Sequence, residues 1–552
     1  MNTSQNLNQE RIALLVLTCI YLVVFNPELP HGDALRIVEQ INSRSLDWNP
    51  NHLLLDPIGY YWYLSLQIVN NSITPLGSFE LISAISTLIS VYLFHLILVN
   101  QKIDDFKTRI LAVILLFGAK NFLTLSVSQY YFMVQMPFLL GALYCLLKYF
   151  NNENKLKNSS YLIISSACLS IATAIEANNI LLIVITGLVL SVKYKNEHSK
   201  ISDALIFYST SALVGFPLFF LGYTLSGSDV SFLSWGLTYA GSNSEEYKQL
   251  YGLQASLSGV VLSFAKLGFN FIFSNFVETS GLGIGLKSLA SSHPLEFNPD
   301  YFGIGLALLA MPIIAVIQLL IFIDFYRQYH SQRIFIFFLG WIISYLIFAF
   351  LWDNGGNIFW FQTLPVIVVI YAYYTQYIFN HRVFVKPFIK NGLLISPLII
   401  ITLNTIQGAA PSAFFDMKRG VAEHNEIVHD GDLEITTGWD KYQWMKEDAI
   451  EANFDKLLLM NMATKQKSDP KHISNLPQIV ENHLAAGKRV IAARLYNKDS
   501  DPNPWYNLSR MGWPRAKIKK MLENYCNREI SRIDDVVFHE IYLCDKNIGD
   551  AD

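Results

Sequence analysis

Charged residues are scarce in this chain: they make up 15% of its 552 residues, whereas 52% are hydrophobic. Soluble globular domains carry about 25% charged residues, so the composition excludes an ordinary soluble protein. The net charge is only -3 at pH 7, which gives no reason to propose a nucleic-acid partner. The five cysteines show no metal-binding spacing. The sequence also has no internal repeat and no low-complexity linker.

A cleavable signal peptide is also missing. The first apolar run, residues 12–25, lacks a small-x-small cleavage site, and residues 26–30 do not supply one. We therefore expect a retained helix that acts as a signal anchor. Long apolar runs continue to about Gly408 and then stop. This pattern predicts a transmembrane domain over residues 1–410 and a polar domain over residues 411–552.

The apolar runs of the first domain are each near the length that crosses a ~30 Å hydrocarbon core. The expected spans are 11–27, 79–99, 109–127, 131–149, 159–175, 177–193, 204–225, 301–324, 334–351, 358–379 and 391–408. The fold class is therefore predicted to be mainly α: a polytopic membrane protein with about 11 to 13 transmembrane helices.

The loops alternate in their content of Lys and Arg. One set is short and basic, as in 102–109 and 382–390, whereas the other set is longer and poorer in these residues. Short basic loops stay in the cytoplasm, which predicts a cytoplasmic N-terminus and an extracytoplasmic C-terminal domain. The two longest outer loops are 28–78 and 226–300, and their apolar stretches 51–71 and 253–277 are expected at the outer interface. The Asn-, Lys- and Ile-rich composition favours a bacterial inner (plasma) membrane over the endoplasmic reticulum.

The C-terminal segment alternates between strand and helix patterns, which predicts a small α/β domain. The expected strands are 456–460, 489–495 and 536–543, and the expected helices are 476–486 and 514–525. Cys526 and Cys544 could form a disulfide if the domain is extracytoplasmic, and the sequence leaves this open.

The leading catalytic candidate is Asp33, in the segment His31-Gly32-Asp33 just past the first span. An outward-facing carboxylate can accept a proton from a hydroxyl, or coordinate a divalent metal such as Mg, Mn or Ca. It can equally cap a helix that starts at Ala34. Arg36 lies one helical turn from Asp33, so it could bind an anionic headgroup or pair with Asp33, and the pair is favoured.

Two further cations are candidates for binding a phosphate. His52 lies in an outer loop just before Asp56-Pro57, which is expected to cap a helix. Lys120 lies inside an apolar run, where an unpaired lysine costs several kcal/mol. It could reach the outer interface along its apolar stem, or line a polar cavity beside Asn121.

Four acidic or imidazole side chains remain as candidates for acceptor or metal binding. Glu176 lies in an outer turn beside two asparagines, and Glu278 lies in the long loop 226–300. His293 and Glu296 are three residues apart and could ligate a metal, but no third partner is visible and an ordinary structural role is favoured. The glycines at 281–285 have the wrong spacing for a phosphate-binding P-loop.

The order of these features resembles a known family. An Asp in the first outer loop is followed by the aromatic helix Pro57-Ile58-Gly59-Tyr60-Tyr61-Trp62-Tyr63, a span with a basic cytoplasmic loop, and a hairpin that leads into Gln135-Met136-Pro137. This order resembles the GT-C glycosyltransferases, in particular the group that includes protein mannosyltransferases and aminoarabinose transferases. The resemblance covers residues 10–200 in motif order and the whole chain in architecture.

The resemblance implies a polyprenyl-phosphate-sugar donor and inverting transfer on the extracytoplasmic face to a hydroxyl of a glycan, lipid or protein. Asp33 would act as the base, and Lys120, Arg36 or His52 would stabilise the departing lipid phosphate. Gly32 and Ala34 stand where family members often carry a second acid, and Gln135 stands where another acid is often found. These departures leave metal dependence and the acceptor class open.

Three other functions compete with this interpretation. A transporter or flippase would need broken helices and polar groups near the bilayer midplane. An O-antigen-type polymerase or ligase would use arginines in outer loops, which are scarce here. A scaffold that displays the C-terminal domain would not explain the Asp33 loop.

Overall fold

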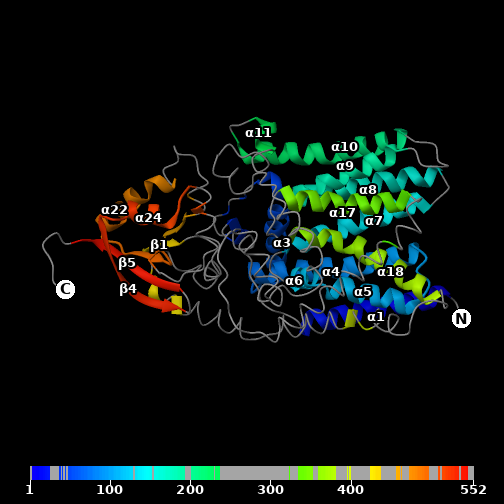
Figure 1. The fold of residues 1–552 in the computed structure, drawn as a ribbon, viewed down its shortest axis with the longest axis horizontal. Coiled ribbons are helices and arrows are strands. Elements are labelled where there is room, and N and C mark those ends of the chain that lie inside the picture. The colour runs from blue at the N-terminus through cyan, green and yellow to red at the C-terminus, as the bar shows by residue number, and fades with distance from the viewer. Residues whose placement is uncertain are drawn as a thin grey trace. The chain divides into compact units, whose positions relative to one another are not determined.

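The computed structural model describes the main part of the chain in two blocks. The described residues are 3–24, 37–38, 40–41, 48–127, 131–151, 155–192, 201–228, 231–236, 333–351 and 358–380, then 423–424, 426–429, 431–436, 455–459, 472–496, 512–533 and 536–544, with a few isolated positions. They divide into a helical unit and a second unit that contains a β-sheet (Figure 1).

The helical unit is built from helices that run side by side (Figure 1). They are α1 (Thr3–Val24), α3 (Leu55–Val69), α4 (Pro75–Asn100), α5 (Phe106–Gly118), α6 (Lys120–Val127), α7 (Gln135–Asn151), α8 (Lys155–Ile175), α9 (Ile180–Ser191), α10 (Ile201–Ser226), α11 (Phe232–Gly236), α17 (Arg333–Leu351) and α18 (Leu364–Asn380). Four short 3-10 turns join them: η1 (Pro50–His52), η2 (Tyr131–Val134), η3 (Ala177–Asn179) and η4 (Ile358–Thr363).

Helix α10 shows that this unit presents apolar side chains to its surroundings. Only 11% of its apolar window is buried inside the protein, and Leu213, Phe216 and Leu225 are more than half exposed. Such a stripe marks a surface that lies in lipid or against a partner. Among the described residues, three helices are long and apolar enough to cross a membrane: α4, Phe132–Asn151 and α10. We therefore treat the unit as a membrane domain, while the number of 11 to 13 spans stays a prediction.

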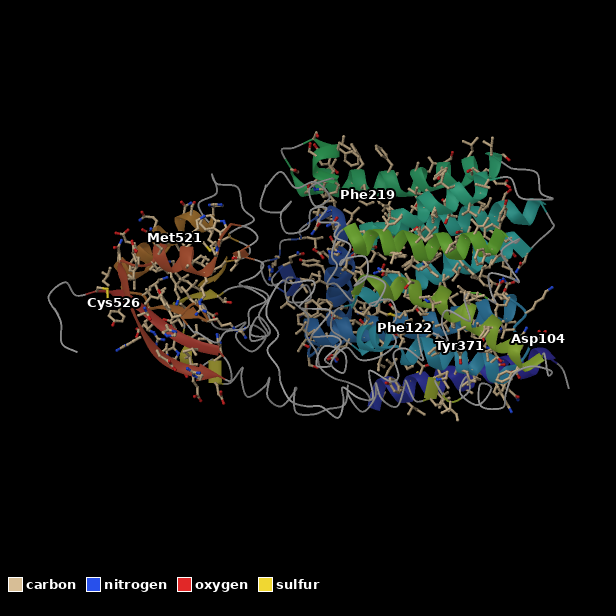
Figure 2. All side chains as sticks on the ribbon, in the orientation of Figure 1. Asp104, Phe122, Phe219, Tyr371, Met521 and Cys526 are labelled. Carbon is tan, nitrogen blue, oxygen red and sulfur yellow. A yellow bond between two sulfur atoms is a disulfide. The ribbon has the colours of Figure 1, made fainter. Side chains whose placement is uncertain are left out.

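Two expected helix boundaries in the helical unit differ from the structure. The run 109–127 is divided into α5 and α6 at Ala119, whose backbone is extended with ψ 134°. The rings of Phe117 and Phe122 pack across this break at 6.2 Å (Phe122 is labelled in Figure 2). Gly118 is the last residue of α5, and the apolar run continues on both sides of it, so hydropathy alone did not show the break. Asp56 was expected to cap α3, but the cap position is Leu54 and Asp56 lies in the first turn.

The second unit contains a five-stranded sheet in the order β2-β1-β3-β5-β4. Strand β1 (Leu433–Thr436) pairs in parallel with β2 (Asp455–Leu458) and β3 (Val490–Ala493). Strand β5 (Val536–Leu543) pairs antiparallel with β3 and with the edge strand β4 (Tyr525–Ile533). The prediction of a small C-terminal domain of strands and helices is confirmed, but the helix expected over 514–525 ends at Met521 and β4 begins at Tyr525.

The core of this unit lies between the sheet and two helices, α22 (Leu476–Ala485) and α24 (Arg515–Met521). Leu433, Val490 and Leu522 belong to this core, and a smaller cluster that includes Phe538 covers other sheet residues. Cys526 in β4 is bonded to Cys544 just after β5, with the two Cα atoms 5.0 Å apart (Figure 2). The disulfide that the sequence left open is therefore present.

Candidate functional site

Two 3-10 turns meet where helix α8 ends. Turn η3 joins α8 to α9 there, and we refer to this as the η3 end of the helical unit. Turn η1 packs against it, because the backbone N–H of Leu54 donates to the carbonyl of Ala174 at 2.8 Å. Asn49 stabilises the start of η1 by accepting a hydrogen bond from the N–H of Asn51 at 3.0 Å. The two turns thereby hold their side chains in a fixed relation.

This arrangement brings together two of the candidates named from the sequence. His52 Nδ1 in η1 lies 2.9 Å from Glu176 Oε2 at the start of η3, with the side chains 19% and 6% exposed. Glu176 has an extended backbone that interrupts the helix between α8 and η3. Its side chain therefore does not follow the helical periodicity of α8. A carboxylate this deeply buried needs a charged or hydrogen-bonding partner, and His52 supplies one.

A network of uncharged side chains lies in the same turn region. Asn179 donates from Nδ2 to Gln135 Oε1 at 2.7 Å and to the carbonyl of Ala172 at 2.9 Å. The hydroxyl of Tyr345, from α17, donates to Asn179 Oδ1. The sequence did not suggest Tyr345, because a tyrosine in an apolar span usually packs. Its hydrogen bond depends on a partner 166 positions away, and no local signal reports that.

Asp56, four residues after His52, has a buried carboxylate with a hydrogen-bond partner. Its Oδ2 accepts from Gln40 Nε2 at 3.1 Å, and its side chain is fully buried. Helix α3 is tied to α4 by Trp62, whose Nε1 donates to the carbonyl of Ser78 at 2.8 Å. These bonds position the helix that follows His52.

The η3 end is recessed relative to the longest neighbouring helix. Helix α9 has 12 residues and α10 has 26, which at 1.5 Å per residue gives ~18 Å and ~39 Å. Helix α10 runs parallel to α8, because Ser166 and Ser170 donate to the carbonyls of Phe207 and Ser211. It therefore extends past the end of α8, where η3 lies. Its far third, which includes Phe219 (labelled in Figure 2), packs around the cluster of Leu53, Ala174 and Trp235. The polar side chains of η1 and η3 therefore lie beside the part of α10 that projects beyond α8 and α9.

The remaining candidates are not placed beside this cluster. Asp33, Arg36, Glu278, His293 and Glu296 lie outside the described residues. Lys120 is the first residue of α6, and its side chain also lies outside the described part of the chain.

We tested whether the described residues fit a divalent metal. Within these ranges no group of three or more His, Cys, Asp or Glu side chains could hold one. His52 and Glu176 provide two donors, whereas Mg²⁺ and Ca²⁺ take about six oxygen ligands. The described residues alone do not fit such an ion.

The chain is similar in fold to solved structures of an archaeal oligosaccharyltransferase, a GT-C glycosyltransferase. The resemblance suggested by the sequence is thus confirmed at the level of the fold. The oligosaccharyltransferase of Archaeoglobus fulgidus in the apo form is 12% identical over 94% of this chain and 73% of that chain, with a TM-score of 0.52. The same protein, AglB, in complex with an inhibitory peptide and a dolichol-phosphate is 13% identical over 94% and 72%, with a TM-score of 0.51.

A weaker match is ArnT from Cupriavidus metallidurans bound to undecaprenyl phosphate. It is 9% identical over 96% of this chain and 97% of that chain, with a TM-score of 0.47. No protein-family profile and no curated protein sequence matches the chain. At these identities the likeness concerns the fold alone.

Proposed function

We propose that this chain transfers a sugar from a polyprenyl-phosphate-linked donor to a hydroxyl acceptor, with inversion, on the extracytoplasmic face of the membrane. The observation that carries the proposal is the buried polar cluster at the η3 end of a helical bundle with the GT-C fold. The AglB structure with a dolichol-phosphate supports the donor class, because it contains a phosphorylated polyprenol. The acceptor can be a glycan, a lipid or a protein.

The proposed base is Asp33. It takes the proton of the acceptor hydroxyl as the oxygen attacks the anomeric carbon, and the lipid phosphate leaves from the opposite side. Lys120, Arg36 and His52 are proposed to stabilise the charge on that phosphate. The contact between His52 and Glu176 supports this role, because a carboxylate on Nδ1 fixes the orientation of the imidazole ring.

Glu278, His293 and Glu296 are proposed to act on the acceptor side or at a metal. An AglB structure contains Zn and sulfate, which makes a divalent ion a reasonable partner for residues outside the described ranges. No step of the proposed transfer depends on the ion.

The disulfide supports the proposed orientation. Disulfides persist in oxidising compartments and are rare in the cytoplasm, and the Cys526–Cys544 bond lies in the second unit. We propose that residues 411–552 form an extracytoplasmic domain, that the N-terminus is cytoplasmic, and that the membrane is a bacterial inner membrane.

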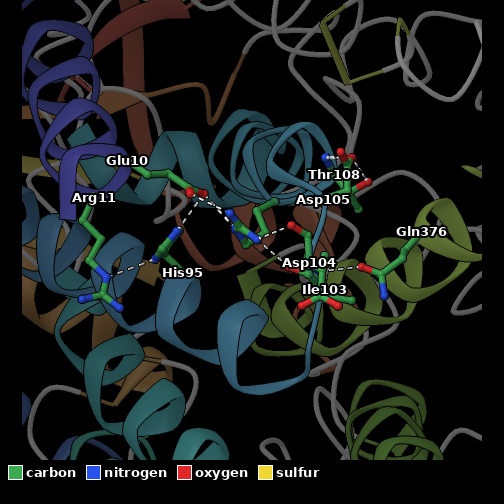
Figure 3. A network of polar contacts seen from close by, with 9 residues as sticks. Glu10, Arg11, His95, Ile103, Asp104, Asp105, Thr108 and Gln376 are labelled. Carbon is green, nitrogen blue, oxygen red and sulfur yellow. Dashed lines mark hydrogen bonds and ion pairs between the residues drawn. The ribbon is translucent and has the colours of Figure 1, made fainter. Parts of the chain in front are cut away.

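The decisive experiment measures sugar release from a panel of synthetic polyprenyl-phosphate sugars by the purified full-length protein in detergent. Asp33→Asn should lower kcat by about 100-fold or more, as expected for loss of a general base. The matched control is Asp104→Asn, because Asp104 is an exposed carboxylate near the start of α5 (Figure 3), and its turnover should equal that of the wild type.

The panel also separates the competing outcomes. Equal turnover of wild type and Asp33→Asn would remove Asp33 as the base. If the wild type turns over none of the donors and instead takes up a donor into vesicles, the protein is a transporter and not a glycosyltransferase. The broken segment α5–α6 is the feature a transporter would use. Turnover measured with and without a chelator decides the metal question.

A further inference from the structure

Three amide side chains at the η3 end are buried without satisfying their hydrogen bonds. Within the described part of the chain, Gln135 Nε2 and both side-chain polar atoms of Asn178 and of Gln362 have no hydrogen-bond partner. Gln135 and Gln362 are fully buried, and Asn178 is 5% exposed. More than 90% of buried polar groups in proteins are paired, so such a group of amides points to a missing partner.

The three amides belong to one location. Trp341 and Tyr345 are four residues apart on α17, so they lie on one face of that helix. Trp341 Nε1 donates to the carbonyl of Gln362 at 3.0 Å. Tyr345 donates to Asn179, which in turn donates to Gln135 at 2.7 Å.

A contact between two aromatic rings also links η2 to η4. The rings of Phe132 and Phe361 lie 5.4 Å apart, and these residues come shortly before Gln135 and directly before Gln362. Asn178 is the chain neighbour of Asn179. These contacts therefore link four elements to one another: η2 with the start of α7, η3, η4 and α17.

The chemistry of the unpaired atoms identifies the class of partner. Asn178 and Gln362 each offer N–H donors and a carbonyl acceptor, Gln135 offers its N–H donors, and none of the three carries a charge. A hydroxyl group also donates and accepts, so a ligand with several hydroxyls matches these atoms. At this end His52 Nδ1 lies 2.9 Å from Glu176 Oε2, and the three amides themselves add no charge. The location therefore suits an uncharged polyhydroxylated ligand better than an anion or a cation.

Each amide adjoins a 3-10 turn. Gln135 follows η2, Asn178 lies in η3 and Gln362 lies in η4. Short 3-10 segments have poorer hydrogen-bond geometry than α-helix and often mark hinges. A small displacement of these turns can open the closed arrangement seen here to a ligand.

We propose that Gln135, Asn178 and Gln362 form the binding site for the sugar of the donor, and that this sugar is uncharged. The proposal rests on the proposed glycosyl transfer and deepens it, since it names the sugar class. The aromatic side chains Trp341 and Phe361 position the two segments that carry the amides.

The test uses the full-length protein in detergent and measures donor binding by thermal shift. Two ligands are compared: a polyprenyl phosphate that carries a neutral hexose, and the same polyprenyl phosphate without sugar. For Gln362→Met and Asn178→Leu we expect a loss of about 10- to 100-fold in affinity for the sugar-bearing lipid. Their affinity for the sugar-free lipid should equal that of the wild type.

A second readout separates binding from a structural role. Replacing a buried, unpaired amide by an apolar side chain of similar shape removes a desolvation penalty. The ligand-free Gln362→Met protein should therefore unfold at the same temperature as the wild type or at a higher one. Gln101→Met is the matched control. Gln101 directly follows the C-terminal end of α4, is buried, and accepts a hydrogen bond from Tyr373 at 2.6 Å. This variant should lose stability but keep wild-type affinity for both lipids.

The outcomes distinguish the two proposals. If the wild type prefers the sugar-bearing lipid and both variants keep that preference, the amide site is wrong while the glycosyl transfer stands. If the wild type prefers an amino sugar or a uronic acid by 10-fold or more, the uncharged class is wrong. If no sugar-bearing lipid is bound more tightly than the sugar-free lipid, both proposals fail.

Discussion

Single residues show two contrasting kinds of buried polar group in the helical unit. Away from the η3 end, Glu10 of α1 is fully engaged (Figure 3). Its carboxylate accepts from Arg109 Nε at 2.9 Å and lies 2.7 Å from an Arg109 terminal nitrogen, and His95 Nε2 lies 2.9 Å from the same group. Arg109 also donates to the carbonyls of Ile103 and Asp104. This network is saturated, so it holds α1, α4 and α5 together, whereas the amides at the η3 end have bonding capacity left over.

Removing one member of the saturated network should be costly. Arg109→Met leaves the Glu10 carboxylate, which is 3% exposed, without its cation. Breaking a buried pair in this way costs about 3–5 kcal/mol of unfolding free energy. We expect this loss in denaturant unfolding of the purified protein.

The double variant Glu10→Gln/Arg109→Met serves as the control. It should recover part of the loss, because no charge is then left alone. Recovery is incomplete because the bonds from Arg109 to Ile103 and Asp104 are gone. A single-variant loss below about 1 kcal/mol would show that the pair is solvated and behaves like a surface ion pair.

The sequence could identify some of these residues but not their partners. His52 and Glu176 stood out as polar positions between apolar runs, yet their contact joins positions 124 residues apart (176 minus 52). Gln135 was noticed only for the acid it replaces. Gln362 and Tyr345 lie in aromatic, apolar surroundings that predict packing, and their role depends on distances that only the folded chain supplies.

At the scale of elements, long apolar runs predicted the helices well because burial in lipid needs continuous hydrophobicity. The break between α5 and α6 escaped prediction because the hydrophobic run continues across Gly118, the last residue of α5. Strand β1 has only four residues. Strand β4 lies at the sheet edge and its sequence, YCNREISRI, lacks a regular apolar alternation. Both strands are determined by their neighbours in the sheet more than by their own sequence.

The packing of η1 against α10 gives a test at this scale. A Cβ atom added at Gly222 would lie 2.1 Å from Leu53 Cδ1, and Leu53 is buried next to His52. Gly222→Ala should therefore displace η1 and lower unfolding free energy by about 1–3 kcal/mol, as overpacking typically does. It should also reduce sugar transfer, because His52 moves with Leu53.

The control lies two turns away on the same helix. At Gly215 the nearest atom to an added Cβ is Ser170 Cβ at 3.9 Å, so Gly215→Ala meets no obstacle. Alanine has a higher helix propensity than glycine, by about 1 kcal/mol, and this variant should be as stable as the wild type or more so. Thermal unfolding and donor turnover check both variants, and equal behaviour of the two would contradict a tight η1–α10 contact.

At the scale of the whole molecule, the order of motifs along the chain suggested the GT-C fold although no sequence profile matches. At 12% identity over 94% of the chain, little sequence signal survives apart from hydropathy and a few turn residues. Hydropathy predicted the helical class, and the order of motifs suggested the fold. The contents of the site were not predictable, because they depend on side-chain contacts between distant segments.

The proposed orientation of the whole chain can be tested through its cysteines. Without reductant, a maleimide mass tag should leave Cys526 and Cys544 unmodified in protein isolated directly from cells, and reduction should make both reactive. Reactivity of both thiols before reduction would place the second unit in the cytoplasm. The variant Cys526→Ser/Cys544→Ser should lower the unfolding free energy of this unit by about 3 kcal/mol, the value expected for a loop of 18 residues.

The shortness of helix α9 has a consequence for the surrounding bilayer. Its side chains Ile180, Val184 and Leu188 form an exposed apolar stripe. Its 12 residues end at Ser191, and the backbone of the next residue, Val192, is extended. A helix of ~18 Å cannot match a ~30 Å hydrocarbon core. The adjoining lipids must thin, at a cost of a fraction of a kcal/mol per Å. The acyl-chain length of the lipids therefore sets the size of this mismatch. Bilayers with short acyl chains reduce it, and bilayers with long acyl chains increase it beside α9.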